Sequence, residues 1–167
     1  MLVAFDLDGT LCDLSHRLHH ILNAEGVKNW PEFFRRCEWD EPIEPMVELC
    51  NMMITCGGGT EVIFVSGRNS VCQEATIRWL RQNIMTLGGL ELGDPEHGFV
   101  DQCRRPLLYM RDEDDRRPDY KVKRELLLRI IEDRGQRPDL VFDDRQQVVD
   151  MWREHGIRCC QVAPGNF

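Results

Sequence analysis

Two aspartates near the N-terminus, Asp6 and Asp8, have a spacing suited to chemistry. They follow an apolar run in the stretch LVAFDLDGT at residues 2–10. A carboxylate at the end of a rigid, buried strand can act as a nucleophile. A second carboxylate two residues later lies at the same strand end and can donate or accept a proton. This stretch therefore predicts reactive carboxylates at the tip of a strand.

Two further apolar runs also end in polar side chains. One is followed by Ser66, Gly67 and Arg68, and the other by Asp143, Asp144 and Arg145. In a doubly wound sheet, ligands bind beyond the carboxyl ends of the strands. We therefore expect all of these side chains to line one pocket, although each motif taken alone is also compatible with an ordinary turn or helix cap.

The predicted pocket would hold four acidic side chains: Asp6, Asp8, Asp143 and Asp144. Crowded carboxylates raise one another's pKa values unless a divalent cation neutralises them. The residues offer hard oxygen ligands without a His/Cys cluster, which favours magnesium. The sequence predicts a Mg²⁺ site and leaves open which residue of the Asp143–Asp144 pair is the direct ligand.

Apolar patterning indicates the elements that position these side chains. Strand-like runs occur at 2–8, 60–68, 107–111, 139–145 and 159–164, and helix-like segments at 45–55, 70–83, 119–135 and 146–156. Their alternation predicts an α/β fold with a Rossmann-like, doubly wound parallel sheet. Residues 13–42 interrupt the alternation with a helical pattern, which predicts a small helical cap inserted into a single domain spanning 1–167.

Bulk properties restrict the function classes. A chain of 167 residues can bury a core of its own, and a net charge of −8 argues against sequence-blind adhesion to nucleic acid while permitting a local cationic pocket. The eight cysteines form no CxxC motif, which fits a reducing compartment. Because we find neither an export signal nor a run long enough to span a membrane, we expect a cytoplasmic protein without membrane contact; its oligomeric state is left open.

The four motifs together resemble the haloacid dehalogenase superfamily of phosphatases. They are DLDGT (6–10), SGR (66–68), a lysine at the opening of a helix, and DD (143–144), in that order. The stretch VFDDRQQVVDMWREHGIRCCQVAPGNF (141–167) is similar to the phosphatase module of phage polynucleotide kinase/3′-phosphatase. That module also has an arginine downstream of DxDGT, matched by Arg17, and a D-x-x-x-K element, matched by Asp119 and Lys123.

The resemblance implies a role for each matched residue. Asp6 would be the nucleophile and Asp8 the general acid and base, while Mg²⁺ would be held by Asp6, the main-chain carbonyl of Asp8, and Asp143 or Asp144. Lys123 would stabilise the transferring phosphoryl group with Asp119 supporting it, and Lys121 is the alternative lysine. The substrate phosphate would be bound by Thr10, Arg17, Ser66, Gly67 and Arg68.

The resulting hypothesis is a magnesium-dependent phosphomonoesterase that removes the 3′-phosphate from nucleic-acid ends through an aspartyl-phosphate, during end repair. The sequence lacks the GxxxxGK[ST] motif of a kinase module, so the resemblance covers the phosphatase half alone, and whether a separate kinase or ligase chain is a partner is left open. A phage origin would place the enzyme in the host cytoplasm, and DNA and RNA substrates are not distinguished. The alternatives are a phosphatase for free nucleotides or other small phosphomonoesters, and a non-catalytic subunit that binds nucleic-acid ends and recruits a kinase.

Aromatic residues in the predicted cap allow two interpretations. Trp30, Phe33, Phe34 and Trp39 have a spacing that fits the core of a small cap, and they could also stack on bases as in single-strand binding proteins. The spacing favours the cap core.

Overall fold

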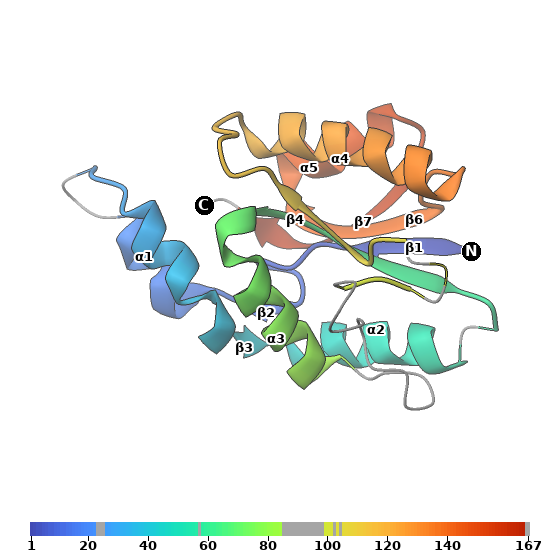
Figure 1. The fold of residues 1–167 in the computed structure, drawn as a ribbon, viewed down its shortest axis with the longest axis horizontal. Coiled ribbons are helices and arrows are strands. Elements are labelled where there is room, and N and C mark those ends of the chain that lie inside the picture. Colours follow the sequence, from blue (N-terminus) through green and yellow to red (C-terminus); the bar gives the residue numbers. More distant parts are fainter. Residues whose placement is uncertain (23–25, 57, 85–98, 102, 104, 166–167) are drawn as a thin grey trace.

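The computed structural model describes residues 1–22, 26–56, 58–84, 99–101, 103 and 105–165 (Figure 1). The C-terminal stretch quoted above is therefore described as far as Gly165, and its last two residues lie outside the described residues.

A five-stranded parallel sheet forms the centre of the fold, in the order β5-β4-β1-β6-β7. The first strand lies in the middle, with Val3 paired to Val62 on one side and to Leu140 on the other. The strands are β1 (Leu2–Phe5), β4 (Glu61–Asn69), β5 (Leu108–Arg111), β6 (Leu140–Arg145) and β7 (Arg158–Gly165). The α/β class and the doubly wound parallel sheet predicted from the sequence are confirmed.

Helices cover both faces of the sheet (Figure 1). Val3 and Phe5 of β1 belong to the core cluster that includes residues of α2 (Glu44–Cys56) and α3 (Gln73–Asn83). Leu2 and Ala4, which point to the opposite face, belong to the cluster that includes residues of α4 (Asp119–Arg134) and α5 (Gln146–Glu154). This burial on both faces explains why β1 reads as a continuous apolar run rather than an alternating one.

The end of the first strand differs from the prediction in a way that matters for the site. The strand expected at 2–8 ends at Phe5, because the carbonyl oxygen of Leu7 accepts hydrogen bonds from the amides of Thr10, Leu11 and Cys12 at 2.8–3.1 Å. Gly9 completes this tight turn with φ +84, a value that favours glycine. Asp6 and Asp8 therefore lie on a rigid loop directly beyond the strand.

Residues between β1 and α2 form a separate small substructure. Its base is a two-stranded antiparallel sheet of β2 (Cys12–Asp13) and β3 (Glu41–Pro42), which the sequence did not indicate. Its helical part consists of the 3₁₀ helix η1 (Ser15–His20), α1 (Trp30–Arg35) and the 3₁₀ helix η2 (Cys37–Trp39). Leu14, Ile21 and Phe33 form a core of its own. In Figure 1 α1 stands beyond the end of β1 that is opposite the N-terminus.

Across the described parts of the chain, none of the helices has the length and apolar character needed to cross a membrane.

Candidate active site

One cavity of about 470 Å³ opens at the carboxyl ends of the central strands. Its floor includes Asp6 and Asp8, which follow β1, and Lys123 of α4. Its walls come from α1, from the ends of β4 and β5, and from the segment that connects β5 to α4. This is the position at which a doubly wound sheet binds its ligands.

Asp6 is held by a buried lysine at the centre of the site. The Lys123 ammonium lies 2.6 Å from Asp6 Oδ1 and 2.8 Å from Asp143 Oδ2. Burial raises the pKa of Asp6, and Lys123 opposes this shift. Burial also disfavours the ammonium, but Asp143 and Asp6 outweigh it and raise the pKa of Lys123. The structure therefore places Lys123, and not the exposed Lys121, beside the predicted nucleophile.

Asp144 is the carboxylate of this group with the weakest compensation, because burial and Asp143 outweigh the attraction of Lys123 and Arg145. Its Oδ1 atom is buried and has no hydrogen-bond partner among the described residues, and burial together with Asp143 raises the pKa of Asp144 to about 6. Gly9 and Gly165 leave room for this side chain, since a Cβ atom at either position would collide with its carboxylate. The structure therefore makes room for the Asp144 carboxylate in a buried position, where a bound cation would stabilise its charge.

Carboxylate oxygens of Asp6, Asp143 and Asp144 lie within 4.8 Å of one another. Hard oxygen donors of this kind suit Mg²⁺. A bound cation would also explain why the buried Oδ1 atom of Asp144 has no hydrogen-bond partner among the described residues. The residues present therefore fit the predicted divalent metal. Asp143 already binds Lys123 and accepts from the Arg145 amide at 3.2 Å, so Asp144 is the better candidate of the pair for a direct ligand.

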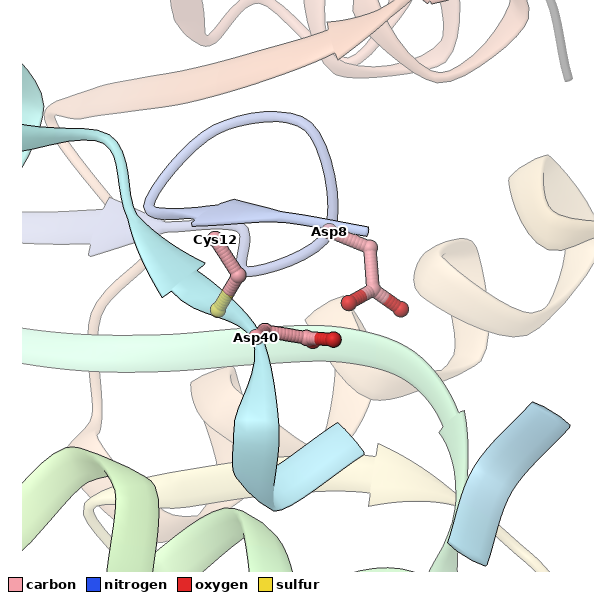
Figure 2. Close-up of side chains that lie close together, drawn as sticks. All are labelled: Asp8, Cys12 and Asp40. Atoms are coloured by element: carbon pink, nitrogen blue, oxygen red, sulfur yellow. The ribbon is translucent and has the colours of Figure 1, made fainter. Parts of the chain in front are cut away.

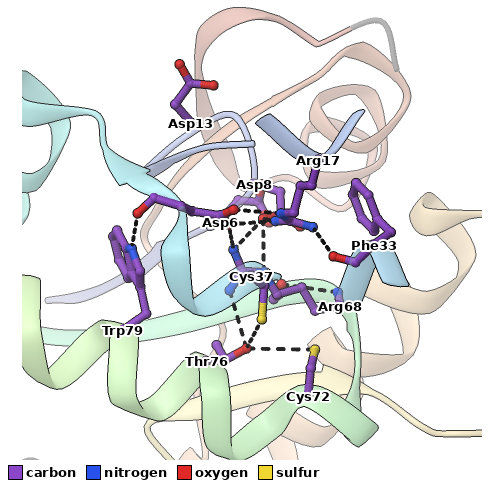
Figure 3. Close-up of polar contacts among 12 residues, drawn as sticks. Asp6, Asp8, Asp13, Arg17, Phe33, Cys37, Arg68, Cys72, Thr76 and Trp79 are labelled. Atoms are coloured by element: carbon purple, nitrogen blue, oxygen red, sulfur yellow. Dashed lines mark hydrogen bonds and ion pairs between the residues drawn. The ribbon is translucent and has the colours of Figure 1, made fainter. Parts of the chain in front are cut away.

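Asp8 is clamped by two arginines (Figure 3). Its Oδ1 atom lies 2.6 Å from Nη2 of Arg17 and 2.6 Å from Nη2 of Arg68, and Nε of Arg68 is 2.9 Å away. Burial acts to raise the pKa of Asp8, but the two guanidinium groups outweigh it and hold this pKa well below its usual range. Asp8 is therefore a carboxylate with a fixed orientation at the floor of the cavity.

The same two arginines share a second buried acid, Asp40, which directly precedes β3. Arg17 donates to it from Nε and Nη2, each at 2.6 Å, and Arg68 donates to Oδ2. Figure 2 shows Asp8 and Asp40 near the thiol of Cys12. The ligand atoms of these three residues lie within 4.8 Å of one another, close enough to bind one metal ion. Because both carboxylates are already neutralised by guanidinium groups, this cluster is an ion-pair network and not a metal centre.

Three of the predicted phosphate-binding residues lie away from the cavity wall. The Arg17 side chain is fully buried, with its guanidinium on the two acids and 4.2 Å from the centroid of the Phe33 ring. Thr10 and Ser66 are also fully buried; the hydroxyl of Thr10 has no partner within the described part of the chain, and that of Ser66 accepts from the Arg68 amide at 3.2 Å. Gly67 and Arg68 do line the cavity, and their role in binding phosphate stays a prediction.

Asp119 contacts arginines rather than the lysine that it was expected to support. Its two carboxylate oxygens accept from Arg111 and Arg145, and Lys123 binds Asp6 and Asp143 instead. A Cβ atom at Gly67 would lie 2.9 Å from Cγ of Asp119, so this glycine permits the acid to approach β4. Asp119 therefore organises the arginine side of the cavity and acts on Lys123 only through its charge.

Sequence reasoning missed two residues of the site, Arg111 and Asp40. Arg111 ends β5, so the rule that located the other strand-tip residues could also have found it. Asp40 belongs to no local motif, and its partners lie 23 and 28 residues away along the chain, so no spacing pattern would have indicated it.

A known protein family matches the chain along its whole length. The family model described as "Polynucleotide kinase PNKP phosphatase domain" matches residues 1–167. A curated relative, the "Putative bifunctional polynucleotide kinase/RNA ligase" of Autographa californica nuclear polyhedrosis virus, is 27% identical over 153 residues, which are 91% of this chain and 18% of that protein.

Solved structures give the same fold. A chain of the Pnkp1/Rnl/Hen1 complex matches with a TM-score of 0.70 and 32% identity, covering 99% of this chain and 47% of that one. A chain of the Pnkp1/Rnl/Hen1 RNA repair complex matches with a TM-score of 0.70 and 31% identity, covering 99% and 43%. A class C acid phosphatase from Bacillus anthracis shares the fold alone, with a TM-score of 0.56 and 15% identity over 98% of this chain and 65% of that one. The chain thus spans under half the length of these repair proteins.

Proposed function

Because the chain belongs to the family of polynucleotide kinase phosphatase domains, and is therefore a phosphomonoesterase, we propose that it removes the 3′-phosphate from nucleic-acid ends. This activity would place it in nucleic-acid end repair, in keeping with its likeness to a chain of an RNA repair complex. Membership in a phosphatase family argues against the non-catalytic end-binding subunit. The residues 13–42 would act as a cap over the site.

The Asp6–Lys123 pair at the floor of the cavity carries this proposal. An ammonium 2.6 Å from one carboxylate oxygen fixes the Asp6 side chain and lowers its pKa, which acts against the effect of burial. Lys123 also supplies positive charge where negative charge develops on a transferring phosphoryl group. A carboxylate held in this way at the bottom of an open cavity is suited to attack on phosphorus.

The reaction would proceed in two displacements. In the first, an oxygen of Asp6 attacks phosphorus, the bond from phosphorus to the 3′ oxygen breaks, and that oxygen leaves with a proton from Asp8. In the second, Asp8 takes a proton from water, the water oxygen attacks phosphorus, and the bond to Asp6 breaks to release inorganic phosphate. The second step needs ionised Asp8, the form that Arg17 and Arg68 favour.

The first step needs protonated Asp8, which the same arginines disfavour. Both guanidinium groups are buried, but Arg68 is among the residues that line the cavity and Arg17 is not. An entering phosphate dianion would therefore meet Arg68 rather than Arg17. Sharing Arg68 with the substrate weakens its hold on Asp8 and raises the pKa of Asp8 when the acid form is needed. We therefore assign Arg68 to substrate phosphate and Arg17 to positioning of Asp8.

A divalent metal, which we assign as Mg²⁺, would be held by Asp6 and Asp144, with Asp143 beside them and the main-chain carbonyl of Asp8 as a further donor. When bound, the ion would polarise the phosphoryl oxygens and offset the charge of the crowded acids. Because Asp6, Asp143 and Asp144 lie together and, among the described residues, only Lys123 forms ion pairs within this group, such an ion would also improve its charge balance.

The walls of the cavity favour a polyanionic substrate. Of the described residues that line it, seven are basic and four acidic, whereas the whole chain has a net charge of −8. Local positive charge of this kind attracts phosphorylated ends while the rest of the surface repels bulk nucleic acid. The curated relative is named as a putative bifunctional polynucleotide kinase/RNA ligase, which supports the proposal that kinase and ligase activities accompany this phosphatase in repair.

Phosphate release from a panel of substrates tests the proposal. We expect magnesium-dependent release from 3′-phosphorylated oligonucleotides, little from the matched 5′-phosphorylated oligonucleotides, and none from either with the Asp6→Asn variant. DNA and RNA versions of the panel would show which nucleic acid is preferred. Faster turnover of free nucleotides or sugar phosphates than of oligonucleotide ends would instead support the small-molecule phosphatase.

A further inference from the structure

The cap side of the cavity presents an aromatic surface. Trp30 and Phe34 line the cavity, and Trp30 is 39% exposed. Their rings are close to parallel, at 23° with centroids 5.7 Å apart, and Phe33 meets Trp30 edge-on at 89° and 5.7 Å. The indole of Trp30 is therefore braced by two neighbours, and it borders the same cavity as Asp6.

Two cations on this cavity have no acidic partner among the described residues. Lys28 and Arg116 are both exposed, and the Lys28 ammonium lies 5.5 Å from the centroid of the Trp30 ring. The other basic residues that line the cavity are each paired with a carboxylate: Arg68, Arg111, Arg117, Lys123 and Arg145. In a chain of net charge −8, two cations without an acidic partner in the described part of the chain mark a place beside the site for an anion other than the scissile phosphate.

The aromatic surface is connected to the reaction centre by direct contacts. The guanidinium of Arg17 lies 4.2 Å from the centroid of the Phe33 ring and donates to the carbonyl oxygen of Phe33 at 3.5 Å (Figure 3). The same guanidinium donates to Asp8 at 2.6 Å. The position of Trp30 relative to the proposed acid and base is therefore set by packing and not by a free loop.

We propose that Trp30, Lys28 and Arg116 form a nucleotide subsite for the strand that precedes the scissile phosphate. A base near the 3′ end stacks on Trp30, and an internucleotide phosphate binds Lys28 and Arg116. The subsite rests on the proposed 3′-phosphatase function and specifies its substrate. Because a base paired within a duplex is already stacked on its neighbours, the ligand is a single-stranded 3′ end longer than one nucleotide.

Substitution of Trp30 tests the stacking contact. We expect Trp30→Ala to reduce kcat/KM on a single-stranded oligonucleotide 3′-phosphate by roughly 10-fold or more, the size of a lost base–aromatic contact, and Trp30→Phe to retain most of the activity. Turnover of p-nitrophenyl phosphate should stay close to that of the wild type. Trp39→Ala is the matched control, because Trp39 is 56% exposed in the same segment and is not among the described residues that line the cavity.

Salt dependence tests the two cations. For a single strand, each lost phosphate contact should reduce the slope of log KM against log salt concentration by about 0.7. We expect this change for Arg116→Ala and for Lys28→Ala, and none for Arg124→Ala, an exposed arginine of α4 away from the cavity. An unchanged slope in both variants would overturn the phosphate half of the proposal.

Binding of an unphosphorylated oligonucleotide separates the subsite from the proposed function. Affinity for a single-stranded 3′-hydroxyl oligonucleotide should fall in Trp30→Ala and Arg116→Ala and not in the two controls, with thermal melting to show that each variant is folded. If the wild type releases no phosphate from oligonucleotides but this binding pattern holds, the 3′-phosphatase function fails and the subsite stands. Equal affinity in all variants, or equal activity losses of Trp30→Ala on oligonucleotide and aryl phosphate, would overturn the subsite.

Discussion

Asp40 and Arg17 form a buried two-point ion pair, with Nε and Nη2 of the arginine each 2.6 Å from a different carboxylate oxygen. Burial raises the pKa of Asp40, and the guanidinium of Arg17 opposes this shift. Together with Asp8 and Arg68 the pair makes a set of two anions and two cations whose charges balance. Asp40 is not among the described residues that line the cavity, so its influence on the reaction passes through the two arginines.

Asp40→Asn keeps the shape of this side chain and removes its charge. Arg17 and Arg68 then act on Asp8 alone, so we expect its pKa to fall further and the protonation of the leaving oxygen to slow. The expected loss in kcat is about 10- to 100-fold, the range for supporting residues that orient a catalytic group. Leaving groups that need no proton should recover part of this loss.

The matched control for Asp40→Asn is Glu38→Gln, which removes an exposed ion pair with Arg78 in the same segment. Exposed pairs contribute at most about 1 kcal/mol, so this variant should melt and turn over like the wild type. A kcat of Asp40→Asn that matches the wild type, in a folded preparation, would contradict the positioning role.

Arg17→Ala should lower activity on an oligonucleotide 3′-phosphate and on an aryl phosphate alike, because Arg17 positions Asp8 rather than reading the nucleic acid. It also leaves Asp40 buried without its main partner, so we expect a loss of about 3 to 5 kcal/mol in the free energy of unfolding. Arg17→Lys should rescue both quantities only in part, since an ammonium cannot make the two-point contact. The measurements are kcat/KM on both substrates and thermal melting. A loss of kcat/KM that is confined to the oligonucleotide would instead indicate that Arg17 binds the substrate.

Asp8→Asn should slow both half-reactions by ~10² to 10⁴-fold, the usual range for a lost general acid and base. The residual rate should depend more steeply on the leaving-group pKa than that of the wild type, because the departing oxygen now leaves without a proton. Rates on a series of aryl phosphates measure this dependence. Equal dependence in variant and wild type would remove Asp8 from the acid role.

The sequence predicted the sheet and the strand-tip residues because both depend on local signals. An apolar run that ends in carboxylates marks a buried strand and its open end, and the order of Asp6, Ser66 and Asp143 along the chain then places these tips together. The exact end of β1 was missed, because a run such as FDLD does not reveal that the carbonyl oxygen of Leu7 accepts hydrogen bonds from three backbone amides in a turn.

The partners of the charged residues could not be predicted in the same way. Arg17 could equally have met phosphate or carboxylate, and the choice depends on Asp40, which is brought to it by the pairing of β2 with β3. Asp119 and Lys123 share a helical face as expected, yet Arg111 and Arg145 compete for Asp119 from two strand ends. Such competition is settled by the three-dimensional arrangement and not by spacing along one helix.

Magnesium binding should be linked to pH through Asp144. In the metal-free protein, burial, reinforced by Asp143, raises the pKa of Asp144 to about 6, and burial likewise raises that of Asp6. Between the usual carboxyl pKa and this raised value the native state binds more protons than the unfolded state, so the free energy of unfolding should fall as pH rises through this window. A cation that binds the carboxylates only in the native state should offset this loss, and its effect should grow with pH.

The measurement is the shift in melting temperature caused by Mg²⁺ at about pH 5 and about pH 8, with a larger shift expected at the higher pH because protons compete for the same oxygens. Asp144→Asn should stabilise the metal-free protein at the higher pH, since it removes a buried charge whose burial outweighs the attraction of Lys123 and Arg145. It should also abolish most of the Mg²⁺ shift, whereas Asp150→Asn, on the exposed side of α5, should change neither quantity. Asp143→Asn should behave differently from the Asp144→Asn and Asp150→Asn variants, because it also leaves Lys123 with one carboxylate partner instead of two.

A shift in melting temperature that is independent of pH, or that persists in Asp144→Asn, would place the ion elsewhere.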